Sequence, residues 1–96
     1  MKNNMGAMSK KGMERFARFV LRDFPQWQMK WTTSGSICMR QARIVYIDKR
    51  FIGKCVWRAK EHFLHEVAHI NTTNDHLHGI VFYGEFIRLL QIFMVK

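Results

Sequence analysis

Residues 56–70 read VWRAKEHFLHEVAHI and carry a long helical pattern of apolar side chains. These side chains recur at spacings that place them on one broad stripe of a helix. Gly53 precedes the segment, and residues 71–75 follow it with short polar side chains that compete for backbone hydrogen bonds. The pattern predicts a helix that begins after Gly53 and ends near Ile70. Its apolar positions are Val56, Ala59, Phe63, Leu64, Val67, Ala68 and Ile70.

The residues before this helix predict another helix and a small sheet. Residues 11–24 have apolar side chains at helical spacing, and Pro25 excludes the residue before it from helical geometry. Trp27, Met29 and Trp31 alternate with polar residues, as in a strand with one buried face. Further segments rich in β-branched residues follow the turn at 33–36. We therefore expect an antiparallel sheet of about three strands, at residues 27–32, 37–40 and 43–48.

The last part of the chain predicts one more helix, from about Val81, with Phe82, Phe86 and Leu89 at the spacing of a buried face. A length of 96 residues allows one domain with a small core. Residues 1–10 are polar and show no helical or strand period, so we expect a flexible basic tail there. The remaining residues, 11–96, are predicted to form a single α+β domain.

Charge and composition limit the class of protein. The net charge is +9, and residues 1–60 hold 14 basic and 3 acidic side chains, whereas residues 61–96 hold 2 and 4. No apolar run is long enough for a membrane span and no secretory signal is recognisable, so we expect a cytoplasmic monomer without a membrane partner. Cys38 and Cys55 lack the CxxC spacing, so the sequence indicates neither a zinc ribbon nor a dense disulfide framework.

The histidines indicate a metal site. All five lie between His62 and His78, and His65-Glu66-Val67-Ala68-His69 matches the HExxH motif. Residues four apart on a helix lie one turn above each other, so two imidazoles can meet at one ion. Glu66 can then take a proton from a water on that metal. The alternative is an adventitious histidine pair on an exposed helix face. His62 is expected at a solvated position of the same helix.

A catalytic zinc site normally has three protein ligands and one open position. Three residues could supply the third ligand. Asp75 lies where a metzincin places its third ligand, but Thr72 stands where those proteins need glycine. His76 and His78 would share one side of an extended segment. The physics of the sequence leaves these alternatives open.

A family resemblance favours His78. The HExxH motif, eight further residues, then His78-Gly79 and Phe82, resembles the pattern of the SprT-like metallopeptidases, the group that includes the Spartan proteases. The resemblance covers about residues 43–90 and implies a minimal zincin-like fold with Zn2+ held by His65, His69 and His78. It implies a peptidase with Glu66 as general base and a protein or peptide substrate. The chain has Ile80-Val81 where Pro-Glu is common in the family.

The resemblance also implies a cellular location, an association with DNA and a binding edge for peptides. The chain is similar to short SprT-like proteins of bacteriophage genomes, which would place it in the host cytoplasm. Spartan-like proteins cut DNA-associated proteins, and a basic surface interleaved with tryptophans would suit DNA. Peptides bound by such folds commonly lie along an exposed strand edge, for which residues 43–48 are the candidate. The predicted nucleic-acid-binding residues are Arg15, Arg18, Arg22, Arg40, Arg43, Lys49 and Arg50.

Two other functions remain open from the sequence. One is a non-catalytic module that binds nucleic acid or a host protein and contains a structural zinc, for which a closed fourth coordination position would be expected. The other is a degenerate helper protein without metal. Tyr46 and Tyr83 are the candidates for a hydrogen-bond donor to the reacting carbonyl group, although each is also a common packing residue.

Overall fold

Three α-helices and a three-stranded sheet form an α+β fold, as the sequence predicts. The computed structural model describes residues 6–72 and 78–94. None of the helices in these two ranges is long and apolar enough to cross a membrane. The elements are α1 (Lys10–Val20), the 3-10 helix η2 (Leu21–Asp23), β1 (Gln28–Thr32), β2 (Ile37–Met39), β3 (Ile44–Asp48), the 3-10 helix η3 (Lys49–Phe51), α2 (Val56–Ala68) and α3 (Ile80–Phe93).

Residues 6–9, which the sequence assigns to a flexible tail, make hydrogen bonds within the fold. Ser9 caps α1, because its hydroxyl oxygen accepts a hydrogen bond from the amide of Gly12 at 2.9 Å. Before it, the amide of Met8 donates to the carbonyl of Lys54 at 2.7 Å. The Met8 side chain is buried, with 4% of its surface exposed. The prediction of a flexible tail is therefore wrong for residues 6–9, because this segment bonds to the chain just before α2.

The sheet is mixed, not antiparallel as predicted. Its strand order is β1-β3-β2, with β1 parallel to β3 and β2 antiparallel to β3. The central position of β3 agrees with its sequence, because Ile44, Val45, Ile47 and Asp48 are all buried. A strand with paired neighbours on both edges lies in the middle of its sheet, where side chains are more buried than on edge strands. The chain therefore passes from β1 to β2 across the position that β3 later fills.

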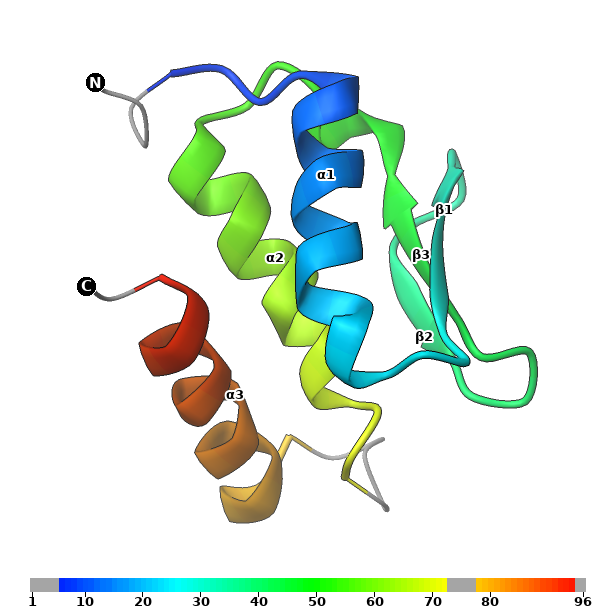
Figure 1. Ribbon diagram of the computed structural model, residues 1–96, viewed down its shortest axis with the longest axis vertical. Coiled ribbons are helices and arrows are strands. Elements are labelled where there is room, and N and C mark those ends of the chain that lie inside the picture. Colours follow the sequence, from blue (N-terminus) through cyan, green and yellow to red (C-terminus); the bar gives the residue numbers. More distant parts are fainter. Residues whose placement is uncertain (1–5, 73–77, 95–96) are drawn as a thin grey trace.

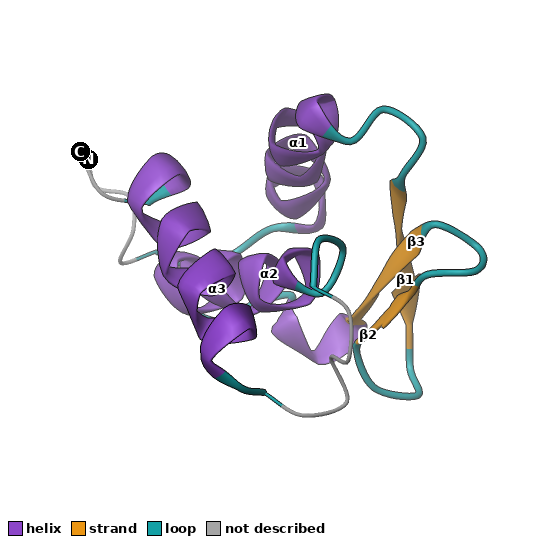
Figure 2. Cartoon of the chain, turned by 90° about the horizontal axis from the view of Figure 1, so that it is seen from below, coloured by secondary structure: helices purple, strands orange, loops and turns teal. Residues whose placement is uncertain are grey.

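All three α-helices lie on one side of the sheet (Figures 1 and 2). The helix α2 occupies the middle of the molecule and contacts α1, β2, β3 and α3. The α2 residues that make the core are fully buried and include Ala59, Phe63, Leu64 and Val67. The histidine-bearing helix is thus fixed from several directions, which limits how its side chains can move.

Candidate metal centre

Three imidazoles from two parts of the chain meet at one point. His65 lies in the last turn of α2, His69 is the C-cap residue of that helix, and His78 lies two residues before α3. One ligand atom from each of the three lies within 4.8 Å of the others. The Nε2 atoms of His69 and His78 are 3.2 Å apart. The group could hold a metal ion, and the structure brings together the three histidines that the sequence predicts.

Phe82 sets the spacing of these rings. Its side chain is 2% exposed and lies in the first turn of α3. The Phe82 ring centroid is 4.4 Å from that of His69, 4.6 Å from His78 and 4.9 Å from His65. One buried aromatic ring therefore supports all three imidazoles from the apolar side. The sequence identifies Phe82 as a core residue, but its contact with every histidine of the group is visible only in the structure.

The protonation states suit metal binding. Burial lowers the pKa of His65, and the neighbouring His78 lowers it further. Because an imidazole binds metal only in its neutral form, a lowered pKa favours the ligand state at neutral pH. Burial also raises the pKa of Glu66 to about 7, against a smaller lowering effect from a hydrogen bond with the Cys38 backbone. A carboxyl group with this pKa can exchange a proton near neutral pH.

Arg40 fixes the end of the metal-binding helix. Its Nε and Nη2 atoms donate hydrogen bonds to the carbonyl oxygen of His69, at 3.1 and 2.8 Å. The last carbonyl groups of a helix lack partners within the helix, and a cation there also complements the helix dipole. Arg40 therefore ties the turn after β2 to the residue that carries one of the three imidazoles. The sequence predicts it as a nucleic-acid contact and gives no signal for this role.

His62 is not at a solvated position, contrary to the prediction. Its ring stacks on Phe51 with centroids 4.0 Å apart and an angle of 14° between the planes. Burial is the main cause that lowers the His62 pKa to about 4, so its imidazole is neutral at neutral pH. The ring is parallel to that of His65 but does not belong to the group of three. Sequence periodicity alone does not show that Phe51 of η3 packs over His62.

Several predicted site residues lie elsewhere or outside the described residues. Asp75 and His76, the alternative third ligands, fall within 73–77, which the structure does not describe. Of the two tyrosines, Tyr83 has its ring 6.3 Å from that of His78. Tyr46 instead lines a hollow on the outer face of the sheet, with Ile37 and Met39.

The residues predicted to bind nucleic acid, apart from Arg40, are exposed but scattered. Arg15 and Arg18 lie on α1, Arg22 lies on η2, and Lys49 and Arg50 lie on η3. Arg43 is in the turn before β3 with a positive φ of 56°. Arg50 pairs with the Asp48 carboxylate at 3.5 Å. These side chains thus come from four separate parts of the chain, and none of them belongs to the metal-binding group.

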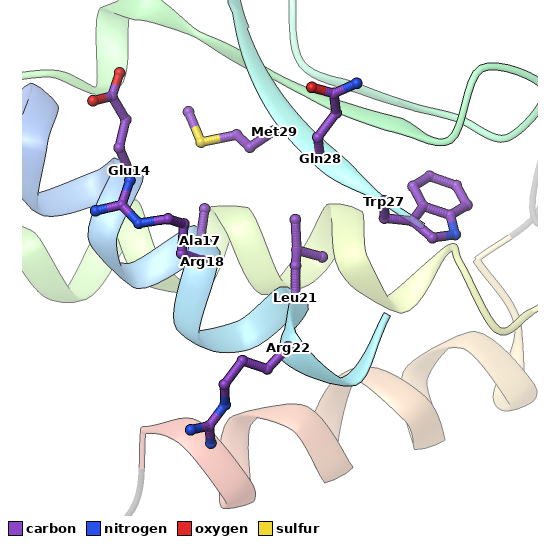
Figure 3. A pocket seen from close by; sticks show the side chains of 8 residues that line it. All are labelled: Glu14, Ala17, Arg18, Leu21, Arg22, Trp27, Gln28 and Met29. Carbon is purple, nitrogen blue, oxygen red and sulfur yellow. The ribbon is translucent and has the colours of Figure 1, made fainter. Parts of the chain in front are cut away.

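Two of these arginines line a cavity of about 510 Å³ between α1 and β1. Arg18 and Arg22 lie along its helical wall and Trp27 lies at its end (Figure 3). Glu14 lies at the opposite end, where its carboxylate accepts a hydrogen bond from the Trp31 indole at 2.8 Å. None of the three histidines of the metal-binding group lines this cavity.

The predicted peptide-binding edge is wrong. Residues 43–48 were expected to offer an exposed strand edge, but β3 is the central strand and pairs on both sides. Its backbone groups are therefore used within the sheet. The outer strands of the sheet are β1 and β2, and the backbone of Cys38 in β2 bonds to Glu66.

Comparisons with known proteins found no match: no family model, no curated protein and no solved structure is similar to this chain at a significant level.

Proposed function

We propose that this protein is a zinc-dependent peptidase in which His65, His69 and His78 hold the metal and Glu66 is the general base. The observation that carries the proposal is that three imidazoles, two from α2 and its C-cap and one from before α3, place ligand atoms within 4.8 Å of one another. The residue after His65 is the buried Glu66. Three neutral nitrogen ligands favour zinc over oxygen-preferring cations such as Mg2+ and Ca2+. Resemblance to SprT-like metallopeptidases supports the same assignment.

The spacing of the ring nitrogens fits zinc. At Zn–N distances of about 2.0–2.1 Å, a tetrahedral geometry separates two ligand nitrogens by about 3.3–3.4 Å. The 3.2 Å between the Nε2 atoms of His69 and His78 is close to that value. A hydrogen bond between the two rings, in which one nitrogen donates and the other accepts, would also fit this distance. A ligand atom of His65, within 4.8 Å of one on each of these two rings, favours a shared ion.

The three histidines match the number of protein ligands in a catalytic zinc site. A structural zinc site is closed by a fourth protein ligand, whereas a catalytic site keeps a position for water. In the part of the chain that the structure describes, the group contains three histidines and no fourth His, Cys, Asp or Glu. The bound zinc would lower the pKa of a coordinated water to about 7 and polarise a carbonyl group.

Glu66 supplies the proton transfer. Its carboxylate accepts a proton from the attacking water and returns it to the amine that leaves, so one group acts first as base and then as acid. In the metal-free chain, burial raises the pKa of Glu66 to about 7, within the range of a group that both accepts and donates a proton near neutral pH. The hydrogen bond with the Cys38 backbone orients the side chain. We extend the proposal to substrates that are DNA-associated proteins, because of the net charge of +9 and the family resemblance.

The test combines zinc content with cleavage. Wild type and the variants Glu66→Gln and His78→Ala are purified, their zinc is counted by mass spectrometry, and cleavage of casein and histone is followed with and without single-stranded DNA. We expect about one zinc per chain in wild type and Glu66→Gln, and a large loss in His78→Ala. Cleavage should fall at least about 100-fold in Glu66→Gln, because proton transfer contributes that much or more.

A matched control is His76→Ala, which removes the nearest alternative ligand and should keep both zinc and cleavage. Loss of zinc in His76→Ala but not in His78→Ala would reassign the third ligand. Stoichiometric zinc without cleavage of any substrate would favour the structural-zinc binding module, and absence of zinc from wild type would contradict the proposal.

A further inference from the structure

A second cavity adjoins His65, one of the three histidines of the metal-binding group. It has a volume of about 400 Å³, within the range of about 300–1,000 Å³ that is usual for ligand sites. It is lined by Phe51, Arg58, Glu61, His62, His65 and Phe86. His65 therefore belongs both to this cavity and to the metal-binding group.

The cavity follows one face of α2. Arg58, Glu61, His62 and His65 recur at spacings of three and four residues, so they lie along one stripe of the helix. The 3-10 helix η3 contributes Phe51 to one wall, and α3 contributes Phe86 to the other. A substrate that is bound at the metal position can therefore extend through this cavity, along α2 toward the N-terminus of the helix.

The lining of the cavity is largely aromatic. Phe51 stacks on His62 at 4.0 Å, and the His62 and His65 rings are parallel within 4° with centroids 6.5 Å apart. The Phe86 ring lies edge-to-face with His65 at 5.4 Å. Aromatic rings prefer offset-stacked or edge-to-face neighbours at about 4.5–7 Å, which these walls can offer to a further ring.

The charges of the cavity cancel. Arg58 is its basic and Glu61 its acidic side chain, so their formal charges have opposite signs. The cavity therefore has no net formal charge that would select an acidic or a basic group, and its four rings can contact an aromatic occupant. Its volume exceeds what a small aliphatic side chain would fill.

We infer that this cavity is a specificity subsite that receives an aromatic side chain of the substrate next to the reacting bond. The inference rests on the proposed function, since it takes the three histidines as the metal position. It assigns substrate selection to Phe51 and His62, which the catalytic scheme does not use. Substrates with phenylalanine, tyrosine or tryptophan at this position are preferred over those with alanine.

The test compares two metal-binding probes that differ by one ring, acetohydroxamate and phenylacetohydroxamate. Their affinities for the zinc-loaded protein are measured by isothermal titration calorimetry, and the zinc content is counted separately. We expect the phenyl probe to bind at least about tenfold more tightly to wild type. In Phe51→Ala the advantage should fall to about twofold, because one wall of the subsite is removed.

Two further variants separate a loss of the subsite from a change in folding. Glu61→Phe fills the cavity from its rim without removing a core contact, and should abolish the advantage while acetohydroxamate binds as in wild type. Trp57→Ala removes an exposed aromatic side chain of the same helix that does not line the cavity, and should keep the advantage.

The outcomes separate this inference from the proposed function. Equal affinities for the two probes in zinc-loaded wild type would overturn the subsite, even if peptides are cleaved. A preference for the phenyl probe that Glu61→Phe removes would support the subsite, even if no peptide is cleaved. A wild-type protein that binds no zinc would overturn both.

Discussion

Glu66 is a buried acid whose ionisation the fold opposes. Its residue surface is 8% exposed, and burial is the largest cause of a pKa raised from 4.5 to about 7. The unfolded chain would ionise this group near pH 4.5, while the folded chain retains its proton up to about pH 7. The free energy of unfolding therefore contains a contribution from Glu66 that is present in full at low pH and decreases as the pH rises through this interval.

Glu66→Gln should remove this pH dependence from the metal-free protein. A shift of that size corresponds to about 3 kcal/mol between the two ends of the interval. We expect the unfolding free energy of the variant, relative to wild type, to increase by up to about 3 kcal/mol from pH 4.5 to pH 7 and to stay constant above it. Urea denaturation of chelator-treated protein at several pH values measures the difference. Parallel curves for the two proteins would show that Glu66 ionises freely in the folded state.

At the scale of elements, the end of α2 depends on a contact from outside the helix. Arg40 follows β2 and donates two hydrogen bonds to the His69 carbonyl. Hydrogen bonds that involve a charged group contribute about 1.5–3 kcal/mol, more than those between neutral groups. The same contact holds the backbone of a residue whose imidazole belongs to the metal-binding group, so stability and metal affinity should change together.

Arg40→Ala should lower the unfolding free energy by about 1–3 kcal/mol and weaken zinc binding by about tenfold or more. Arg40→Lys should restore part of the unfolding free energy and part of the zinc affinity, because an ammonium group can make one of the two hydrogen bonds. Zinc affinity is measured by competition with a chromophoric chelator, and stability by urea denaturation. The control is Arg15→Ala, an exposed helical arginine, which should change stability by no more than about 0.5 kcal/mol. A zinc affinity equal to wild type in Arg40→Ala would limit Arg40 to a role in stability.

The helices could be predicted from the sequence because their signals are local. Apolar spacing gives α1, α2 and α3 to within a few residues, and HExxH places His65, Glu66 and His69 on one helix. The pairing of the strands could not be predicted, because the turn after β1 suggests a hairpin with β2. Neither Arg40 nor His62 could be assigned, because their contacts with His69 and Phe51 depend on how separate elements pack.

At the scale of the whole molecule, the metal-binding group joins two helices of a small domain. A chain of 96 residues has a limited core, and its radius of gyration of 12.7 Å is close to the roughly 12.5 Å expected for this length. His65 and His69 belong to α2, whereas His78 precedes α3, which packs mainly against α2. An ion bound by all three would therefore add a link between α2 and α3 that the unfolded chain lacks.

Zinc should raise the melting temperature of the wild-type protein. A ligand at about 100 times its dissociation constant stabilises the folded state by about 2.7 kcal/mol, and 1 kcal/mol corresponds to about 4–8 °C in a domain of this size. We expect a rise of about 10–20 °C over chelator-treated protein, measured by circular dichroism across a series of zinc concentrations. His78→Ala should lose most of this rise, because the link to α3 is removed while the HExxH pair remains on α2. His76→Ala should keep it. A rise of equal size in His78→Ala would show that the ion binds to α2 alone, so that the two helices are held together by their apolar contacts and not by the metal.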